Sequence, residues 1–171
     1  MKFIPRKPRL EHATPFWVSN PDYFITICCL RRGFNQLCRP EVVQVIFQSA
    51  HTYQVSHRWY CELLVLMPDH MHLILSVGET KKIADVVGTW KRWMAKKVGT
   101  QFQDGFFDHR LRGAASAQEK WDYVNLNPVR KGLVSRVEDW PYRWTGKELS
   151  AGSANSAGDL GDVAAIWVLG G

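Results

Sequence analysis

Long hydrophobic runs are missing from this sequence, and so are paired cysteines at metal-binding spacing. No apolar segment approaches the roughly 20 residues that cross a bilayer, and the basic N-terminus is not followed by the hydrophobic region of a signal peptide. The four cysteines form no CxxC pair, so neither a zinc finger nor a disulfide framework is indicated. These absences predict a cytoplasmic protein with reduced thiols and no membrane partner.

Negative charge is also scarce relative to positive charge. The chain has 22 lysines and arginines against 16 aspartates and glutamates, a formal net charge of +6, which favours polyanionic partners such as nucleic acid. With 171 residues, 46% of them hydrophobic, the chain can bury the core of one domain. We expect that domain to span residues 1–145, with 1–21 as an irregular basic arm. Residues 146–171, rich in Gly, Ala and Ser, are expected to be a flexible or docking tail.

What is present is organised around residues 63–78, which have the sequence LLVLMPDHMHLILSVG. Two apolar runs flank a Pro-Asp turn signal, which predicts two adjacent strands joined tightly. Because side chains alternate between the faces of a strand, His70 and His72 should share one face, and Met71 and Leu73 the other. Two such imidazoles can chelate one metal ion. The ordinary alternative is a pair of surface histidines, since His-x-His is a short motif.

The other expected elements surround this hairpin in a regular order. We expect strands at 23–30, 58–67, 70–77 and 106–112, and helices at 40–53, 81–98 and 116–128. The order strand, helix, strand, strand, helix, strand is typical of the ferredoxin-like split βαβ fold. The sequence therefore predicts an α+β protein with an antiparallel four-stranded sheet, two helices on one face, and a third, C-terminal helix. The aromatic residues 140–144 should pack on this domain.

Helical periodicity makes predictions for two of these helices. In the helix at 81–98, Trp90 and Trp93 both fall on the apolar stripe, so we expect both to be buried. The third helix should start at Ser116, which has capping-box spacing to Glu119, and should stop or kink at Pro128.

On the third helix, two polar residues lie away from the apolar stripe. Tyr123 is about 200° around the helix from Trp121, and Asn127 follows Tyr123 by one turn. Tyr123 and Asn127 should therefore share a face.

Three ordered motifs together resemble a known family. They are MPDHMHLIL around His70, GFFDHRLR ending at Arg112, and YVNLNPVRKGLV beginning at Tyr123. Over roughly residues 14–145 the chain is similar to the single-tyrosine HUH transposases, specifically the REP-associated tyrosine transposases of bacteria. The resemblance implies a DNA transposase or endonuclease that cleaves and rejoins single-stranded DNA hairpins through a covalent 5′-phosphotyrosine.

The resemblance also implies roles for individual residues. Tyr123 would be the nucleophile, His70 and His72 metal ligands, and Asn127 the polar residue that completes the metal site. A divalent ion neutralises charge on a scissile phosphate, and this mixed ligand set suits Mg²⁺ or Mn²⁺ in a working enzyme. An amide is a weaker ligand than a carboxylate, so other residues stay open as the third ligand: Glu62, Asp108 and His109.

A single-stranded DNA hairpin is the expected partner, and a homodimer is possible. The expected phosphate contacts are Lys91, Arg92, Lys96, Lys97, Arg110, Arg112, Arg130 and Lys131. Because such contacts release counterions, binding should weaken steeply with salt.

Two other functions stay open at this point. With His109 as a third ligand, His70 and His72 could bind zinc in a hydrolase that activates water. Alternatively, the chain could be a basic nucleic-acid-binding module in which both histidines are incidental. The first alternative predicts that Tyr123→Phe leaves activity largely intact, and the second that no DNA is cleaved with any divalent metal.

Overall fold

The computed structural model describes residues 22–146. The expected arm at 1–21 and all but the first residue of the expected tail at 146–171 lie outside the described residues. The elements, in chain order, are β1 (Tyr23–Cys28), α1 (Pro40–Val55), β2 (Tyr60–Met67), β3 (His70–Ser76), α2 (Ile83–Val98), β4 (Phe107–Arg110), α3 (Ala114–Arg130), a short 3₁₀ helix (Val137–Asp139) and β5 (Arg143–Thr145). Every expected helix and strand is present, and β5 is added. No helix of residues 22–146 is long and apolar enough to cross a bilayer.

The strands form one antiparallel sheet in the order β4-β1-β3-β2-β5, which confirms the α+β fold. The fifth strand was not predicted. Residues 143–145 pair with Leu63, Leu64 and Val65 of β2, so this aromatic segment extends the sheet as well as packing on it. A strand of three residues is too short to carry an alternating pattern that sequence could reveal.

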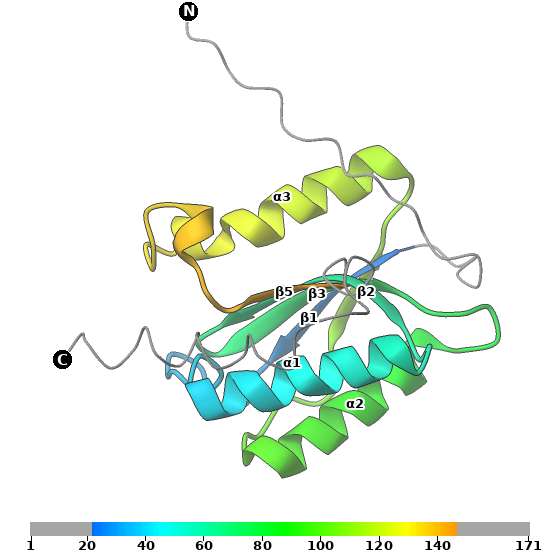
Figure 1. Cartoon of the computed structure of the whole chain (residues 1–171), viewed down its shortest axis with the longest axis horizontal. Coiled ribbons are helices and arrows are strands. Elements are labelled where there is room, and N and C mark those ends of the chain that lie inside the picture. Colours follow the sequence, from blue (N-terminus) through cyan, green and yellow to red (C-terminus); the bar gives the residue numbers. More distant parts are fainter. Residues whose placement is uncertain (1–21, 147–171) are drawn as a thin grey trace, which may run out of the picture.

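Helices cover both faces of the sheet (Figure 1). Helices α1 and α2 lie on one face, as predicted, and α3 lies across the other. The larger core cluster contains Ile46 of α1, Trp90 of α2, and Ile25, Leu64 and Leu73 of the sheet. A separate, smaller cluster under α3 contains Ala117, Val124, Phe24, Val65 and Ile74. The face of the sheet that carries His72 is therefore partly covered by α3.

The β2–β3 hairpin has the predicted form. Met67 pairs with His70, so Pro68 and Asp69 alone make the turn. The predicted alternation is confirmed, because Met71 is buried in the larger cluster, whereas His72 contacts α3. Strand β3 is the central strand of the sheet, so its backbone is hydrogen-bonded on both sides.

One prediction about α2 is wrong. Trp90 is fully buried, but Trp93 has 42% of its surface exposed. The buried positions of α2 are Val87, Trp90 and Met94. Trp93 is one residue, or about 100°, from Met94 around the helix, which places it on the flank of the buried stripe.

The predicted start of α3 at Ser116 is wrong, and so is a stop at Pro128. The helix begins at Ala114, with Gly113 as its N-cap and no side-chain cap, so Ser116 lies inside the first turn. Gly113 has a φ of 84°, a conformation that glycine adopts at little cost, and this turns the chain into the helix early. Pro128 stays within the helix, which runs to Arg130. Because Pro128 is close to the end, the hydrogen bond it removes affects only the last turn.

Candidate functional site

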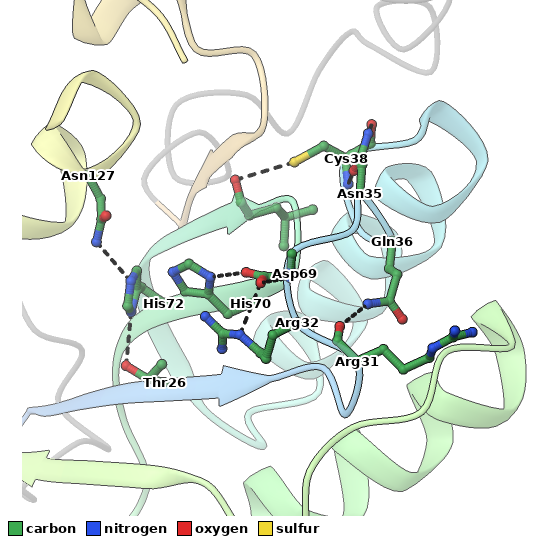
Figure 2. Close-up of polar contacts among 12 residues, drawn as sticks. Thr26, Arg31, Arg32, Asn35, Gln36, Cys38, Asp69, His70, His72 and Asn127 are labelled. Atoms are coloured by element: carbon green, nitrogen blue, oxygen red, sulfur yellow. Dashed lines mark hydrogen bonds and ion pairs between the residues drawn. The ribbon is translucent and has the colours of Figure 1, made fainter. Parts of the chain in front are cut away.

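The two histidines of β3 lie side by side on the face that α3 covers. Their ring centroids are 4.9 Å apart. Figure 2 shows both rings held by hydrogen bonds from neighbouring elements, His70 by Asp69 and His72 by Thr26 of β1 and Asn127 of α3. The pairing of β1 with β3 places Thr26 directly opposite His72.

Asp69 orients His70. The Oδ1 atom of Asp69 lies 2.7 Å from His70 Nδ1, which donates to it, and this leaves Nε2 as the ring nitrogen with a free lone pair. The Oδ2 atom accepts from the Gly33 N–H at 2.7 Å and pairs with Arg32 Nε at 3.0 Å. Burial alone would raise the pKa of Asp69, but the hydrogen bonds from Gly33 and His70 and the charge of Arg32 together lower it. The carboxylate is therefore a fixed anion behind the imidazole.

His72 is held at both ring nitrogens. Its Nδ1 lies 2.9 Å from Thr26 Oγ1, and its Nε2 lies 2.9 Å from Asn127 Nδ2. Because the Asn127 amide donates to Nε2, the ring proton belongs on Nδ1, where it donates to Thr26. The Nε2 lone pair then points to α3. Metal-binding histidines likewise have one nitrogen fixed by a neighbour, here Nδ1 by Thr26, and a metal ion at Nε2 would take the place of the Asn127 N–H.

Both imidazoles are neutral at neutral pH. Burial lowers the pKa of His72 to about 3, and the charges of His70 and Arg32 act in the same direction. Burial also lowers the pKa of His70, although Asp69 opposes this effect. Neutral imidazole is the form that binds a metal ion.

The pKa of His72 predicts that acid destabilises the fold. The folded pKa of about 3 lies below the ordinary value of 6.5, so the unfolded chain takes up a proton first as the pH falls. Stability is full above about pH 6.5 and is lost towards pH 3, at up to about 1.4 kcal/mol per pH unit. Thermal unfolding between pH 7 and pH 4 should show a steeper fall in Tm for the unaltered chain than for His72→Leu. Parallel slopes would contradict this assignment.

Tyr123 lies beside the histidines. The prediction that Tyr123 and Asn127 lie away from the apolar stripe of α3 is wrong for Asn127, which is buried against the sheet next to that stripe. Its ring centroid is 6.2 Å from that of His72 and 6.1 Å from that of Phe24. Tyr123 is 39% exposed, so a large substrate can reach it. Tyr123 and Asn127 therefore share the face of α3 that is turned to the sheet at β1 and β3.

The chemistry of the donor set fits a divalent ion. His70 and His72 are preoriented and neutral, and the Asn127 amide is within hydrogen-bonding distance of His72. Among residues 22–146, no group of three His, Cys, Asp or Glu side chains could hold a metal ion, so Glu62, Asp108 and His109 do not complete the pair. Asn127 is the polar residue of α3 that the structure places against His72.

The predicted phosphate contacts fall into three groups. Arg130 stacks on the Tyr123 ring, with its guanidinium 5.2 Å from the centroid, and the charge of Lys131 reaches His70. Arg110 and Arg112 line a shallow cavity together with His109. The other four, Lys91, Arg92, Lys96 and Lys97, belong to α2 on the opposite face of the sheet. Of these, Lys91 donates to the backbone carbonyls of Gln103 and Gly105.

Several contributors to the site were not predicted. They are Phe24, Thr26, Arg32, Asp69 and Lys120. Asp69 could have been found from its position next to His70, but it was interpreted only as a turn residue. The others depend on the pairing of β1 with β3 and on the placement of α3, which no local pattern reveals.

Comparison with known proteins finds relatives in sequence and similar solved structures. No family model matches the chain. A REP-associated tyrosine transposase of Escherichia coli strain K12 is 30% identical over 157 residues, which cover 88% of this chain and 93% of that protein. A solved structure of a REP-associated tyrosine transposase bound to a REP hairpin has a TM-score of 0.67 at 22% identity, over 86% of this chain and 91% of that one. The second comparison establishes a common fold.

Proposed function

This chain belongs to the REP-associated tyrosine transposases, and we propose that it cleaves and rejoins single-stranded DNA at REP hairpins with Tyr123 as the nucleophile. The observation that carries this proposal is the position of α3 on the sheet. The helix brings Asn127 to within 2.9 Å of His72 and, one turn earlier, the Tyr123 ring to within 6.2 Å of the same imidazole. A candidate nucleophile and a candidate metal site thus meet at one point.

The proposed reaction is two transesterifications at one phosphorus. In cleavage, the Tyr123 oxygen forms a bond to phosphorus and the bond from phosphorus to the 3′ oxygen breaks. The phenolic proton is released to solvent, and the departing 3′ oxygen gains one. In rejoining, a 3′-hydroxyl attacks the 5′-phosphotyrosine and Tyr123 leaves. The covalent bond keeps the energy of the phosphodiester, so no external energy source is needed.

His70, His72 and Asn127 would hold Mg²⁺ or Mn²⁺, and the Asn127 amide, whose Nδ2 atom faces His72 Nε2 in the structure, would turn to offer its oxygen. Bound there, the ion would neutralise and align the scissile phosphate. The contribution of the chain is to keep both imidazoles neutral by burial and to fix their orientation through the hydrogen bonds that they donate to Asp69 and Thr26.

The direct test is incubation of the full chain with a labelled single-stranded REP hairpin and Mn²⁺ or Mg²⁺. A denaturing gel should show a shortened strand and a protein–DNA adduct, and mass spectrometry should place the adduct on Tyr123. Chelation should remove both products. Hairpin binding without an adduct in either metal would support the basic binding module instead.

Thr26→Val tests the support behind His72. The substitution keeps the shape of the side chain but removes the partner of His72 Nδ1, so the ring proton is left without an acceptor and the imidazole loses one of its two fixed contacts. We expect Mn²⁺ affinity to fall about 10-fold to 100-fold, at a stability cost of roughly 1–3 kcal/mol. Isothermal titration with Mn²⁺ measures the first effect and thermal unfolding the second. Unchanged Mn²⁺ affinity in a folded variant would show that Thr26 does not orient a ligand.

A further inference from the structure

Besides Arg130, a second cationic side chain, Lys120, lies against the ring of the candidate nucleophile Tyr123. The ammonium of Lys120 is 5.4 Å from the centroid of the Tyr123 ring and 5.5 Å from that of Phe24. Lys120 precedes Tyr123 by one helical turn, so the two side chains lie on neighbouring positions of α3. Lys120 is half-buried, because its ammonium lies over these two rings.

No acid of the described chain neutralises this ammonium. Within residues 22–146, the ion pairs involve other side chains, and neither Lys120 nor Arg130 takes part in one. The rings of Phe24 and Tyr123 attract the cation, but they carry no charge that would cancel it. Arg130, at the C-terminal end of α3, also contacts this ring, and its guanidinium carbon is 5.2 Å from the ring centroid. Two uncompensated positive charges therefore flank Tyr123.

The reaction places negative charge on the oxygen of the ring over which the Lys120 ammonium lies. A phenol is a weak nucleophile until its oxygen gains anionic character, and nearby cations favour the anion. The same oxygen regains that charge when it leaves phosphorus during rejoining. A cation already positioned and partly shielded from water stabilises such charge more strongly than a solvated one. Phe24, which is buried under both side chains, holds Lys120 near Tyr123.

We propose that Lys120 is a further catalytic residue, which stabilises negative charge on the Tyr123 oxygen in both cleavage and rejoining. This inference rests on the proposed function. Lys120 differs from a DNA-binding cation because it acts on the nucleophile itself. Its loss should slow the chemical step at saturating DNA and leave affinity for DNA nearly unchanged.

The experiment compares the full chain with Lys120→Gln, Lys120→Arg and Lys82→Gln. Lys82 is an exposed residue before α2, so Lys82→Gln removes one positive charge far from Tyr123 and serves as the charge-matched control. Protein in excess over a labelled single-stranded REP hairpin, with Mn²⁺, gives the single-turnover rate of adduct formation. Rejoining is started by adding a strand with a free 3′-hydroxyl to the isolated adduct. Affinity for DNA is measured in the Tyr123→Phe background, where no cleavage intervenes.

We expect Lys120→Gln to slow cleavage and rejoining by about 100-fold each, with the DNA Kd changed less than about 3-fold. Lys120→Arg should recover most of the rate because it keeps the charge, and Lys82→Gln should match the unaltered chain. Equal rates for Lys120→Gln and the unaltered chain would overturn the inference alone. A loss of rate in Lys120→Gln that disappears at saturating DNA would also overturn the inference, because it would show that Lys120 acts in DNA binding. No adduct from the unaltered chain would overturn the proposed function itself.

Discussion

Tyr123→Phe is expected to abolish covalent adduct formation and to lower strand cleavage by at least about a thousandfold. The substitution removes one oxygen and keeps the ring that packs edge-on against Phe24, at 6.1 Å between centroids, so the fold and the position of α3 should be unchanged. Hairpin affinity should also be retained, because cations such as Arg130 and Lys131 remain. Denaturing gels measure the adduct and cleavage, and fluorescence anisotropy measures binding.

Tyr23→Phe is the matched control for this variant. Tyr23 lies on β1, and its side chain packs against the larger core on the other face of the sheet, so removal of its hydroxyl should leave the adduct yield unchanged. An adduct formed by Tyr123→Phe, or an adduct mapped to another residue of the unaltered chain, would contradict the assignment of the nucleophile. Cleavage that persists in Tyr123→Phe without an adduct would indicate attack by water.

His70→Ala is expected to lower strand cleavage about as much as Tyr123→Phe does, but through loss of metal binding. The variant removes one of two neutral imidazoles whose centroids are 4.9 Å apart, and a single remaining histidine chelates poorly. We expect Mn²⁺ affinity to fall at least about 100-fold and metal-dependent cleavage by about a thousandfold. Titration of Mn²⁺ followed by electron paramagnetic resonance measures binding without DNA, and the labelled hairpin measures cleavage.

His70 is a better choice than His72 for this test, because its side chain is 12% exposed and its removal leaves less of a buried cavity. His51→Ala is the control, since His51 lies on α1 at the far side of the sheet. Undiminished Mn²⁺ binding by His70→Ala would remove His70 from the metal site. Loss of cleavage with normal Mn²⁺ binding would indicate that His70 acts on the DNA instead.

Much of the fold follows from patterns that are local in sequence. The β2–β3 hairpin was predictable because Pro68 and Asp69 interrupt two apolar runs, and alternation then fixed the faces of His70 and Met71. The shared face of Tyr123 and Asn127 followed from one helical turn. Such patterns depend only on the periods of strands and helices, so they can be recognised in the sequence without knowledge of tertiary packing.

The predictions that were wrong, and the site residues that were missed, depend on contacts between distant segments or on the local backbone conformation at the ends of helices. The exposure of Trp93 reflects how α2 is rotated on the sheet, and the early start of α3 reflects the backbone of Gly113. The hydrogen bond of Thr26 to His72 joins residues 46 positions apart. No single-sequence pattern specifies the register of β1 on β3, so Thr26 could not have been placed at the site.

The separation of the two core clusters determines what a copy of the gene without Tyr123 would encode. Tyr123 is exposed and belongs to neither cluster, and the core formed with α1 and α2 includes no residue of α3. A gene copy that has lost Tyr123 would therefore still encode a folded protein with its basic residues in place. Such a protein would occupy the same hairpins as active copies without cutting them. Decayed copies would thus act as competitors that limit transposition in the same cell.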